Sequence, residues 1–264
     1  MCEIFCFNSN NPKEVNECLE CFYGHSDEHP HGWGLANMQK DESMIDKEPV
    51  KASCSQHLKN ILSNPVIGKN VFAHIRLATV GEIISPNCHP FIEADDNNRS
   101  WMLIHNGTIF DYPELDKYKE KEHGDTDSER ILLYIIDKIN DFEAKKGSVS
   151  TIKERFYILE KIIRNLSKNN KLNLMIYDGD LTYIHSNMKD SLYYLKNDEG
   201  FLVASTPLTD DKEWKPVELN KLFGLIDGNI IFESEEHENE FILTEENKKA
   251  MEDFLKSITG EIHD

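Results

Sequence analysis

The feature that most constrains this chain is a cysteine at position 2, directly behind the initiator methionine. Removal of Met1 would leave a thiol and an α-amine on one residue, so a nucleophile and its general base would lie about one side-chain length apart. The reference pKa of an α-amine, roughly 7.7 to 8.0, is below that of a free thiol at about 8.5, so the amine can accept a proton near neutral pH. The apolar run over 3–7 alternates between two faces and predicts a short strand that holds Cys2 at its mouth. Any second residue can also be a cysteine by chance.

Further motifs with chemical content are spread along most of the chain. They are His31-Gly32-Trp33-Gly34, Ala73-His74-Ile75-Arg76-Leu77-Ala78-Thr79-Val80-Gly81, Asn87-Cys88-His89-Pro90-Phe91, His105-Asn106-Gly107, Gly124-Asp125-Thr126-Asp127-Ser128-Glu129, and Ala204-Ser205-Thr206-Pro207-Leu208 with Trp214 downstream. In these motifs and in their order the chain resembles the class II glutamine amidotransferases. It is most similar in type to their short stand-alone bacterial and archaeal members, which lack a fused synthase domain.

This resemblance implies both a fold and a reaction. The implied fold is the four-layer αββα sandwich of the N-terminal nucleophile (Ntn) hydrolases, whereas periodicity alone predicts only an α+β chain. The implied reaction is attack of the Cys2 thiolate on the side-chain amide of glutamine, which gives a tetrahedral oxyanion, then a thioester and free ammonia. Water later releases glutamate, and no metal or cofactor is needed. Because the motifs run from end to end, we expect a single domain over 1–264.

The catalytic residues expected from this reaction are Cys2, Asn106 and Gly107. Asn106 can offer its side-chain amide to the oxyanion and Gly107 its backbone N–H, since glycine allows the backbone to approach closely. An Asn-Gly pair is also the usual signature of a type I′ hairpin turn, and the two interpretations are compatible.

The substrate-binding residues expected are Arg76, Thr79, His105 and Asp127. Arg76 suits bidentate binding of an α-carboxylate, Thr79 can add a hydroxyl to that contact, and Asp127 can receive the α-ammonium. His105 stands at the end of the strand predicted just before the Asn-Gly pair. The alternatives are a structural salt bridge for Arg76 and a helix first-turn acid for Asp127, which the helix dipole favours. His89 could orient a loop or be a buried structural histidine.

Two positions depart from the synthase-linked members of the family. Leu77 stands where those enzymes usually carry Trp, and Val80 stands where they usually carry His. Leu77 is expected to pack without consequence, but Val80 removes a polar group from the carboxylate end of the site. A larger γ-glutamyl amide, such as a peptide or a biosynthetic intermediate, is therefore an alternative to free glutamine as the substrate.

Composition limits the partners of the chain. It has 48 acidic and 29 basic residues and a formal net charge of -19, which would repel nucleic acid and anionic membranes. No apolar run approaches the roughly 18 to 20 residues that span a bilayer, and no leader pattern opens the sequence. We expect a cytoplasmic enzyme that acts on a small molecule, with a synthase or peptidase as a conceivable protein partner.

The cysteines have a competing interpretation as a metal site. Cys18 and Cys21 have CxxC spacing, with three histidines close behind them. A helix predicted over 12–23 would instead place both cysteines on or beside its apolar face, where a free cysteine behaves as a small hydrophobe. We therefore expect no metal there, and no disulfides in a reducing compartment.

The remaining elements follow from periodicity and turn chemistry. Strands are predicted over 71–77, 101–105, 172–177, 181–185, 192–195 and 201–205 and on either side of Asp227-Gly228, with a loop or hairpin turn over 92–100. Helices are predicted from Asp127, behind a Thr126-x-x-Glu129 capping box, and over 151–167 and 244–258.

Three functions remain open at this stage. The first is an amidohydrolase or amidotransferase, and the second is a glutaminase subunit that supplies ammonia to a separate synthase. The third is a non-catalytic amino-acid-binding relative, against which Cys2 argues because a binding protein needs no thiol there. The sequence has neither a GxGxxG nor a GxxxxGK[ST] motif, so any acceptor of ammonia would lie on another protein.

Overall fold

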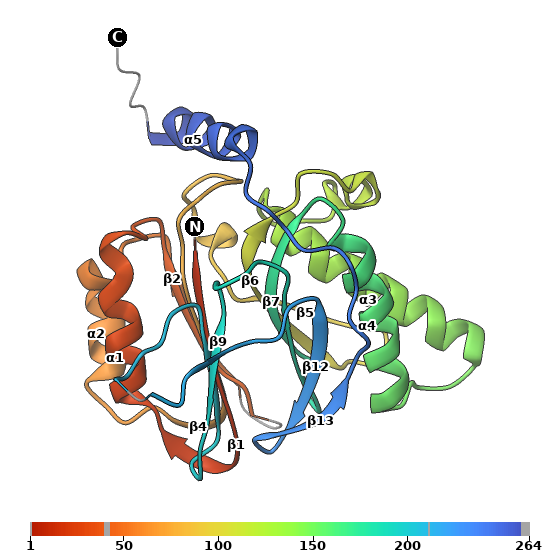
Figure 1. Cartoon of the computed structure of the whole chain (residues 1–264), viewed down its shortest axis with the longest axis horizontal. Coiled ribbons are helices and arrows are strands. Elements are labelled where there is room, and N and C mark those ends of the chain that lie inside the picture. The colour runs from red at the N-terminus through yellow and green to blue at the C-terminus, as the bar shows by residue number, and fades with distance from the viewer. Residues whose placement is uncertain (1, 40–42, 211, 260–264) are drawn as a thin grey trace.

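The computed structural model describes residues 2–39, 43–210 and 212–259. In this part of the chain the strands form two antiparallel sheets that face each other (Figure 1). The first sheet has the order β11 (Lys215–Pro216), β9 (Tyr193–Lys196), β10 (Phe201–Ala204), β1 (Glu3–Glu14), β4 (Ile67–Ile75), β2 (Trp33–Asn37) and β3 (Met44–Glu48). The second has the order β13 (Asn229–Glu233), β12 (Lys221–Ile226), β8 (Thr182–Ser186), β7 (Lys171–Tyr177), β6 (Ser100–Thr108) and β5 (Phe91–Ala94).

Helices cover the outer faces of the sheets. α1 (Asn16–Gly24) and α2 (Gln56–Leu62) lie on the first sheet, and α3 (Asp127–Lys146) and α4 (Ile152–Leu166) lie on the second (Figure 1). α5 (Glu245–Thr259) lies apart, at the end of the sandwich where the N-terminus is found. This confirms the α+β class and the αββα layering expected from the resemblance.

Strand alternation divides the apolar residues among three layers. In β1, Phe5 and Phe7 face α1 and α2, whereas Ile4 and Cys6 pack between the sheets. In β6, Trp101 and Leu103 pack against α3 and α4, while Met102 and Ile104 face the first sheet. Because successive side chains of a strand point to opposite faces, both strands are buried on two sides. β1 and β6, each paired on both sides, are thus buried mounts for the residues at their ends.

Two predicted boundaries were wrong at the start of the chain. The helix expected over 12–23 begins only at Asn16, and the strand expected over 3–7 continues to Glu14. β1 regains its pairing with β4 at Lys13 and Glu14, after a register irregularity that begins beyond Asn8. Pro12 falls in this interruption, where a residue without an N–H costs the ladder nothing.

The other predicted strands and helices are confirmed within a few residues. The Asp227-Gly228 turn has positive φ at both residues (51° and 73°), as a type I′ hairpin requires. Only half of the predicted capping box at Thr126 forms: its hydroxyl accepts the Glu129 N–H at 3.3 Å, but the Glu129 carboxylate accepts the N–H groups of His123 and Gly124. A complete box, which the sequence analysis did not identify, caps α4 at Thr151.

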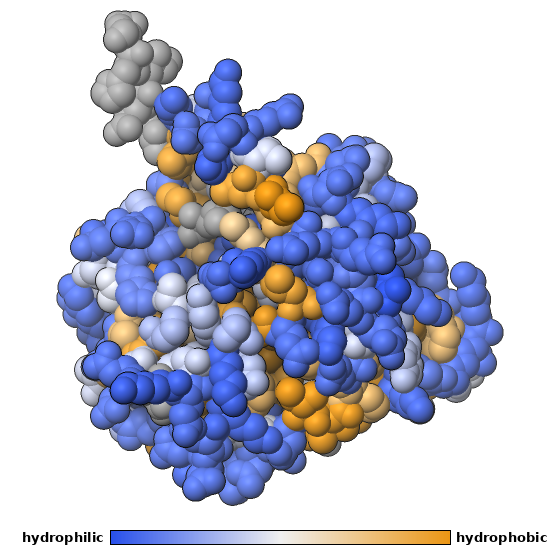
Figure 2. All heavy atoms as spheres, in the orientation of Figure 1, coloured by the Kyte–Doolittle hydropathy of each residue, from blue (hydrophilic) through white to orange (hydrophobic). Residues whose placement is uncertain are grey.

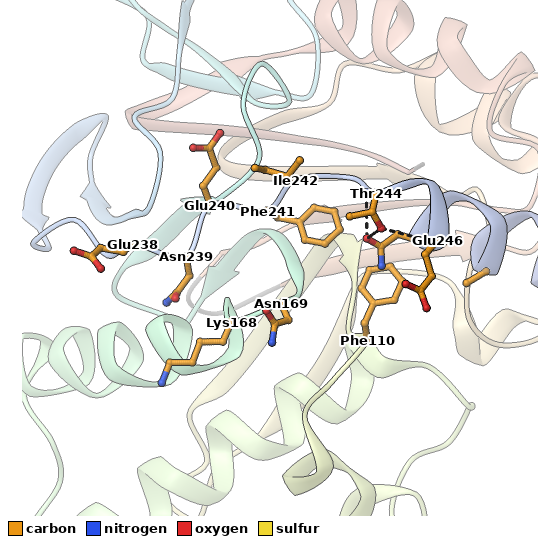
Figure 3. A pocket seen from close by; sticks show the side chains of 12 residues that line it. Phe110, Lys168, Asn169, Glu238, Asn239, Glu240, Phe241, Ile242, Thr244 and Glu246 are labelled. Carbon is orange, nitrogen blue, oxygen red and sulfur yellow. Dashed lines mark hydrogen bonds between the residues drawn. The ribbon is translucent and has the colours of Figure 1, made fainter.

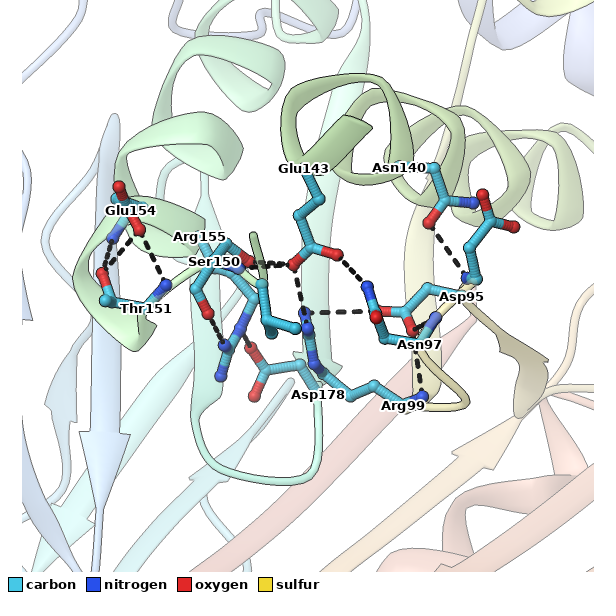
Figure 4. A network of polar contacts seen from close by, with 12 residues as sticks. Asp95, Asn97, Arg99, Asn140, Glu143, Ser150, Thr151, Glu154, Arg155 and Asp178 are labelled. Atoms are coloured by element: carbon cyan, nitrogen blue, oxygen red, sulfur yellow. Dashed lines mark hydrogen bonds and ion pairs between the residues drawn. The ribbon is translucent and has the colours of Figure 1, made fainter. Parts of the chain in front are cut away.

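Buried ion pairs fix α3 and α4 on the second sheet (Figure 4). Arg155 of α4 donates from Nε to Asp178 Oδ2 at 2.6 Å, in the turn between β7 and β8. Glu143 of α3 accepts from Arg99 at 3.0 Å and from the Ser150 hydroxyl, and these hydrogen bonds hold the pKa of its carboxyl at about 2 although burial acts to raise it. Removing one partner of such a buried pair typically costs about 3 to 5 kcal/mol.

The surface is mostly hydrophilic, with small apolar areas over the β12–β13 hairpin and beside α5 (Figure 2). Exposed apolar side chains there include Ile230, Ile231 and Ile242. Among the described residues, no helix combines the length and the apolar character needed to cross a membrane.

Candidate active site

Cys2 lies directly before β1. It is two residues from Ile4 and four from Cys6, which pack between the sheets, so strand alternation places Cys2 on the same side. Its thiol is half-buried and contacts the backbone of Leu77, just beyond the end of β4. Cys2 Sγ is 3.3 Å from Leu77 O and 3.4 Å from Leu77 N. Since β1 and β4 pair from Glu3 and Ile75 onward, the sheet itself sets this contact.

A small cavity of about 20 Å³ opens beside the thiol. Its lining includes these predicted site residues: Cys2, Arg76, Thr79, His105, Gly107 and Asp127. They come from the ends of three elements that are distant in the sequence, namely β1, the loop after β4, and the β6–α3 region. The cavity has about the volume of one water molecule.

Asn106 and Gly107 lie inside β6, so the alternative that this pair forms a hairpin turn is wrong. The strand predicted to end at His105 continues to Thr108, because Asn106 pairs with Asn173 and Gly107 with Leu172 of β7. Side-chain sterics explain the glycine: a Cβ on Gly107 would overlap the backbone oxygen of Lys171.

The Asn106 side chain is buried and held at both ends. Its Oδ1 accepts a hydrogen bond from Lys171 Nζ at 2.8 Å, and its Nδ2 donates to Ser205 Oγ at 3.3 Å. The Ser205 hydroxyl also accepts the N–H of Ile4 at 3.0 Å, which ties Asn106 to the strand that carries Cys2. Lys171 is not among the site residues expected from the sequence. Its only sequence signal is a charged residue at the start of an apolar strand.

Arg76 is buried, and its guanidinium holds the loop at the cavity rim. Nη1 donates to Glu82 O at 2.8 Å, and Nη2 donates to Val80 O and Gly81 O at 2.9 and 3.0 Å. Three of its five N–H groups therefore bind backbone carbonyls. Neither of the two expected roles, carboxylate binding and a structural salt bridge, included these contacts. Val80 takes part in this arrangement through its backbone carbonyl group, which accepts a hydrogen bond from Arg76.

Asp127 is the first residue of α3, where the helix dipole favours a negative charge. Its Oδ2 accepts the N–H of Ile109 at 2.8 Å, and its Oδ1 accepts from Ser128 Oγ at 3.3 Å. His105 Nδ1 is 3.0 Å from the same Ser128 hydroxyl. Burial lowers the pKa of His105 and the Asp127 charge opposes this shift, so the imidazole is mainly neutral at pH 7.

Other polar groups complete the walls. Thr79 Oγ1 is 3.0 Å from Thr108 Oγ1, and His31 Nδ1 accepts the Ala78 N–H at 3.0 Å. His89, which also lines the cavity, stacks on His74 with ring centroids 4.0 Å apart. Burial lowers the pKa of both stacked histidines well below 6.5, so they are neutral.

The CxxC pair lies on α1, on the outer side of the first sheet. Cys18 is half-buried against the core beneath α1, and Cys21 is exposed. In the residues that the structure describes, no three His, Cys, Asp or Glu side chains are grouped so that they could hold a metal ion.

A much larger cavity, about 800 Å³, lies beneath α5 (Figure 3). Its lining includes Phe110, which follows the Ile109 bound by Asp127, and Phe241, whose ring stacks on Phe110 with centroids 5.8 Å apart. Glu238, Glu240 and Glu246 also line it. Phe110 of this cavity is thus only a few residues along the chain from Gly107, which lines the small cavity. The lining of the large cavity includes acidic and aromatic side chains.

Comparisons with known proteins find related sequences. A family model described as "Glutamine amidotransferases class-II" matches residues 1–201. A Haemophilus influenzae protein whose name places it with the glutamine amidotransferases is 27% identical over 244 residues, covering 83% of this chain and 82% of that protein. The glutamine–fructose-6-phosphate aminotransferase of Sulfolobus acidocaldarius is 25% identical over 252 residues, covering 87% of this chain but 42% of that enzyme.

Solved structures share the fold at lower identity. The structure of a predicted glutamine amidotransferase from Pseudomonas aeruginosa PA01 has a TM-score of 0.63 and 18% identity, covering 87% of this chain and 99% of that one. Glutamine phosphoribosylpyrophosphate amidotransferase from B. subtilis has a TM-score of 0.62 and 18% identity, covering 88% of this chain and 48% of that one.

Proposed function

The chain belongs to the class II glutamine amidotransferases, and we propose that it cleaves the side-chain amide of glutamine or of a γ-glutamyl compound through a Cys2 thioester. The observation that carries this proposal is the convergence of Cys2, Gly107, Arg76 and Asp127 on one cavity, from three separate elements. A fold alone does not define a function, but a nucleophile, an oxyanion donor and two opposite charges in one site do favour amide chemistry on an amino acid.

The proposed reaction begins with proton transfer from the Cys2 thiol to its own α-amine. The thiolate attacks the amide carbon, and the oxyanion is met by Asn106 Nδ2 and by the backbone N–H of Gly107. The amine then returns the proton to the leaving nitrogen, which departs as ammonia or as an amine. Water hydrolyses the thioester to release the γ-carboxylate.

The strand geometry supports the part given to Gly107. The N–H of its partner Leu172 donates to Asn187 Oδ1 at 2.8 Å, so this cross-strand pair does not exchange the usual hydrogen bonds. In an antiparallel strand such a residue points its N–H away from that partner. On the other side of β6, the pairing with β5 ends at Leu103. The Gly107 N–H is thus available at a strand edge beside the cavity.

The charges at the cavity support recognition of an α-amino acid. Asp127 is buried and negative beside the Ile109 N–H, and Arg76 offers the guanidinium N–H groups that the loop 80–82 does not use. We place the α-ammonium at Asp127, the α-carboxylate at Arg76 with Thr79, and His105 behind them. In this scheme substrate entry rearranges the loop that Arg76 holds.

A larger γ-glutamyl compound is the second candidate substrate, and the cavity beneath α5 favours it. Its volume of about 800 Å³ lies in the range of ordinary small-molecule sites, whereas the cavity beside Cys2 is far smaller. The remainder of such a compound would leave as an amine toward Phe110 and Phe241. As an alternative, released ammonia would pass to a synthase on a separate chain.

The proposed function is tested by mass spectrometry and by product analysis. Intact mass of the active protein should show loss of Met1, which lies outside the described residues, because a retained methionine would block the α-amine. Incubation with glutamine and a panel of γ-glutamyl amides should release ammonia or the matching amine, and the electrophile diazo-oxo-norleucine should label Cys2.

Two cysteine variants make this test specific. Cys2→Ala should abolish product release and labelling with little change in melting temperature. Cys54→Ala is the matched control, since Cys54 is exposed on a short 3-10 turn and contacts no proposed site residue. Active protein that retains Met1, or label on another cysteine with Cys2 untouched, would refute the proposed mechanism.

A further inference from the structure

We propose that Lys171 is a positioning residue for the oxyanion hole: its buried ammonium fixes the orientation of the Asn106 amide and places a positive charge toward Cys2. This inference rests on the proposed function, because it assigns a task to a residue beside the same nucleophile. It adds a residue that neither the motifs nor the cavity lining includes.

Strand register brings Lys171 to this place. Lys171 opens β7 opposite Thr108, and Asn173 pairs with Asn106, so Lys171 and Asn106 are diagonal neighbours on one face of the β6–β7 pair. Met102, Ile104 and Met175 continue that face and pack between the two sheets. The ammonium is therefore buried at the end of the layer whose other wall carries Cys2.

The contact between Lys171 and Asn106 determines which way the amide points. Lys171 Nζ lies 2.8 Å from the atom assigned as Asn106 Oδ1. A protonated lysine has donors and no acceptor, so the atom that faces it must be the amide oxygen. In an asparagine without such a partner, the oxygen and nitrogen could exchange places and turn an acceptor toward the oxyanion.

The amide nitrogen is thereby directed to the opposite side. One of its N–H groups donates to Ser205 Oγ at 3.3 Å, and Ser205 is bound in turn to the Ile4 N–H. An amide nitrogen carries two N–H groups, so the second can meet the oxyanion that forms at the Cys2 substrate complex. Lys171 and Ser205 thus hold Asn106 in the donor orientation before the substrate arrives.

Charge gives Lys171 a second effect on the same reaction. Burial lowers its pKa to about 8, although attraction to a Cys2 thiolate acts in the opposite direction. Among the described residues, its charge interacts with Cys2 from the first sheet, and it also helps to lower the pKa of His105, whose ring lies on the other face of β6. Lys171 is mainly charged at pH 7, where an anionic thiolate or oxyanion would be its counter-charge.

Lys171→Met and Lys171→Gln separate these effects. Methionine removes both the charge and the donor, whereas glutamine removes the charge but can still donate to Asn106 Oδ1. Loss of one oxyanion donor lowers kcat by about 10²- to 10³-fold, and an interaction made only in the transition state should leave KM nearly unchanged. We expect that loss for Lys171→Met and a partial recovery of kcat for Lys171→Gln.

The pH profile supplies a readout that a merely structural role would not change. In the wild type, kcat should rise as the α-amine loses its proton and fall above about pH 8 as Lys171 becomes neutral. Both variants should lack that alkaline fall. Lys47→Met is the matched control, because Lys47 is a half-buried lysine whose ammonium binds the backbone oxygens of Cys88 and Pro90. It should retain the wild-type profile.

Alkylation of Cys2 by iodoacetamide at pH 7 tests Lys171 without any turnover. Loss of the ammonium should slow alkylation at least several-fold in both Lys171 variants and not in Lys47→Met. An unchanged rate of Cys2 alkylation in the Lys171 variants would overturn the inference. So would an unchanged fall of kcat at alkaline pH, with kcat reduced only by the fraction of protein that is unfolded. If the wild type released no ammonia or amine from any γ-glutamyl amide, the proposed function would fail, and the alkylation rates would still decide the role of Lys171.

Discussion

An Asp127→Asn substitution removes one negative charge and the acceptor of a long hydrogen bond from the Ser128 hydroxyl, and it keeps the shape of the side chain. The asparagine oxygen can still accept the Ile109 N–H that Asp127 Oδ2 now accepts at 2.8 Å, so the link between β6 and α3 is retained. If Asp127 binds the substrate α-ammonium, the variant loses one partner of a buried charge pair, at about 2 to 5 kcal/mol. Since about 1.4 kcal/mol is a factor of ten, kcat/KM for glutamine should fall by about 30-fold or more.

Stability should change far less than activity. Loss of an acid from the first turn of a helix costs about 0.3 to 1 kcal/mol, or at most about 4 °C in melting temperature for a chain of this size. The assay measures kcat/KM for glutamine and for N-acetyl-glutamine in the wild type and in Asp127→Asn. Because N-acetyl-glutamine has no α-ammonium, its kcat/KM should change by less than about threefold. Equal losses on both substrates, accompanied by early melting, would show that Asp127 serves only the fold.

Two further predictions concern the rim and the C-terminal segment. Arg76→Lys keeps the charge, but a lysine cannot span the three carbonyls of 80–82. We therefore expect at least a tenfold rise in KM and faster hydrogen exchange of that loop. Unchanged exchange would contradict the part given to Arg76 in holding the loop. Burial lowers the pKa of His185 to about 3 and that of its partner His237 to about 4, with the two Nε2 atoms 3.0 Å apart. In the unfolded chain the histidine pKa is near 6.5, so below that pH the unfolded chain binds more protons than the folded one. The free energy of unfolding should therefore fall by about 2 to 3 kcal/mol between pH 6.5 and 4.5 because of His185 alone. Urea midpoints at both pH values should show a clearly smaller loss in His185→Asn, and an equal loss would argue against a buried neutral pair.

Residue types predicted which side chains come together better than they predicted local structure. Cys2, Arg76 and Asp127 were identified because a thiol, a guanidinium and a carboxylate each limit what a site can do, and all three do line one cavity. The contacts of Arg76 could not be foreseen in the same way. Its partners are backbone carbonyls of 80–82, and every residue has such a carbonyl, so no sequence pattern marks them.

The Asn-Gly pair shows where local preference gave way to tertiary structure. Asn106-Gly107 has the composition of a type I′ turn, yet seven consecutive residues of β6, from Met102 to Thr108, pair with β7. Lys171 was missed for a related reason. A lysine at the start of a strand is normally solvated, and only the register with β6 shows that its side chain lies on the inner face, opposite the N-terminal strand.

The β6–β7 register therefore determines the chemistry as well as the packing. Alternation places Asn106 and Thr108 between the sheets and His105 on the side of α3, where it meets Ser128. The side chains of Asn106 and His105, two neighbouring residues with different proposed tasks, thus lie on opposite faces of one strand. A slip of one residue between β6 and β7 would exchange these faces, turning the Asn106 amide toward the helices and away from Cys2. The fully paired ladder, with Gly107 fitted closely against the Lys171 carbonyl, excludes that slip.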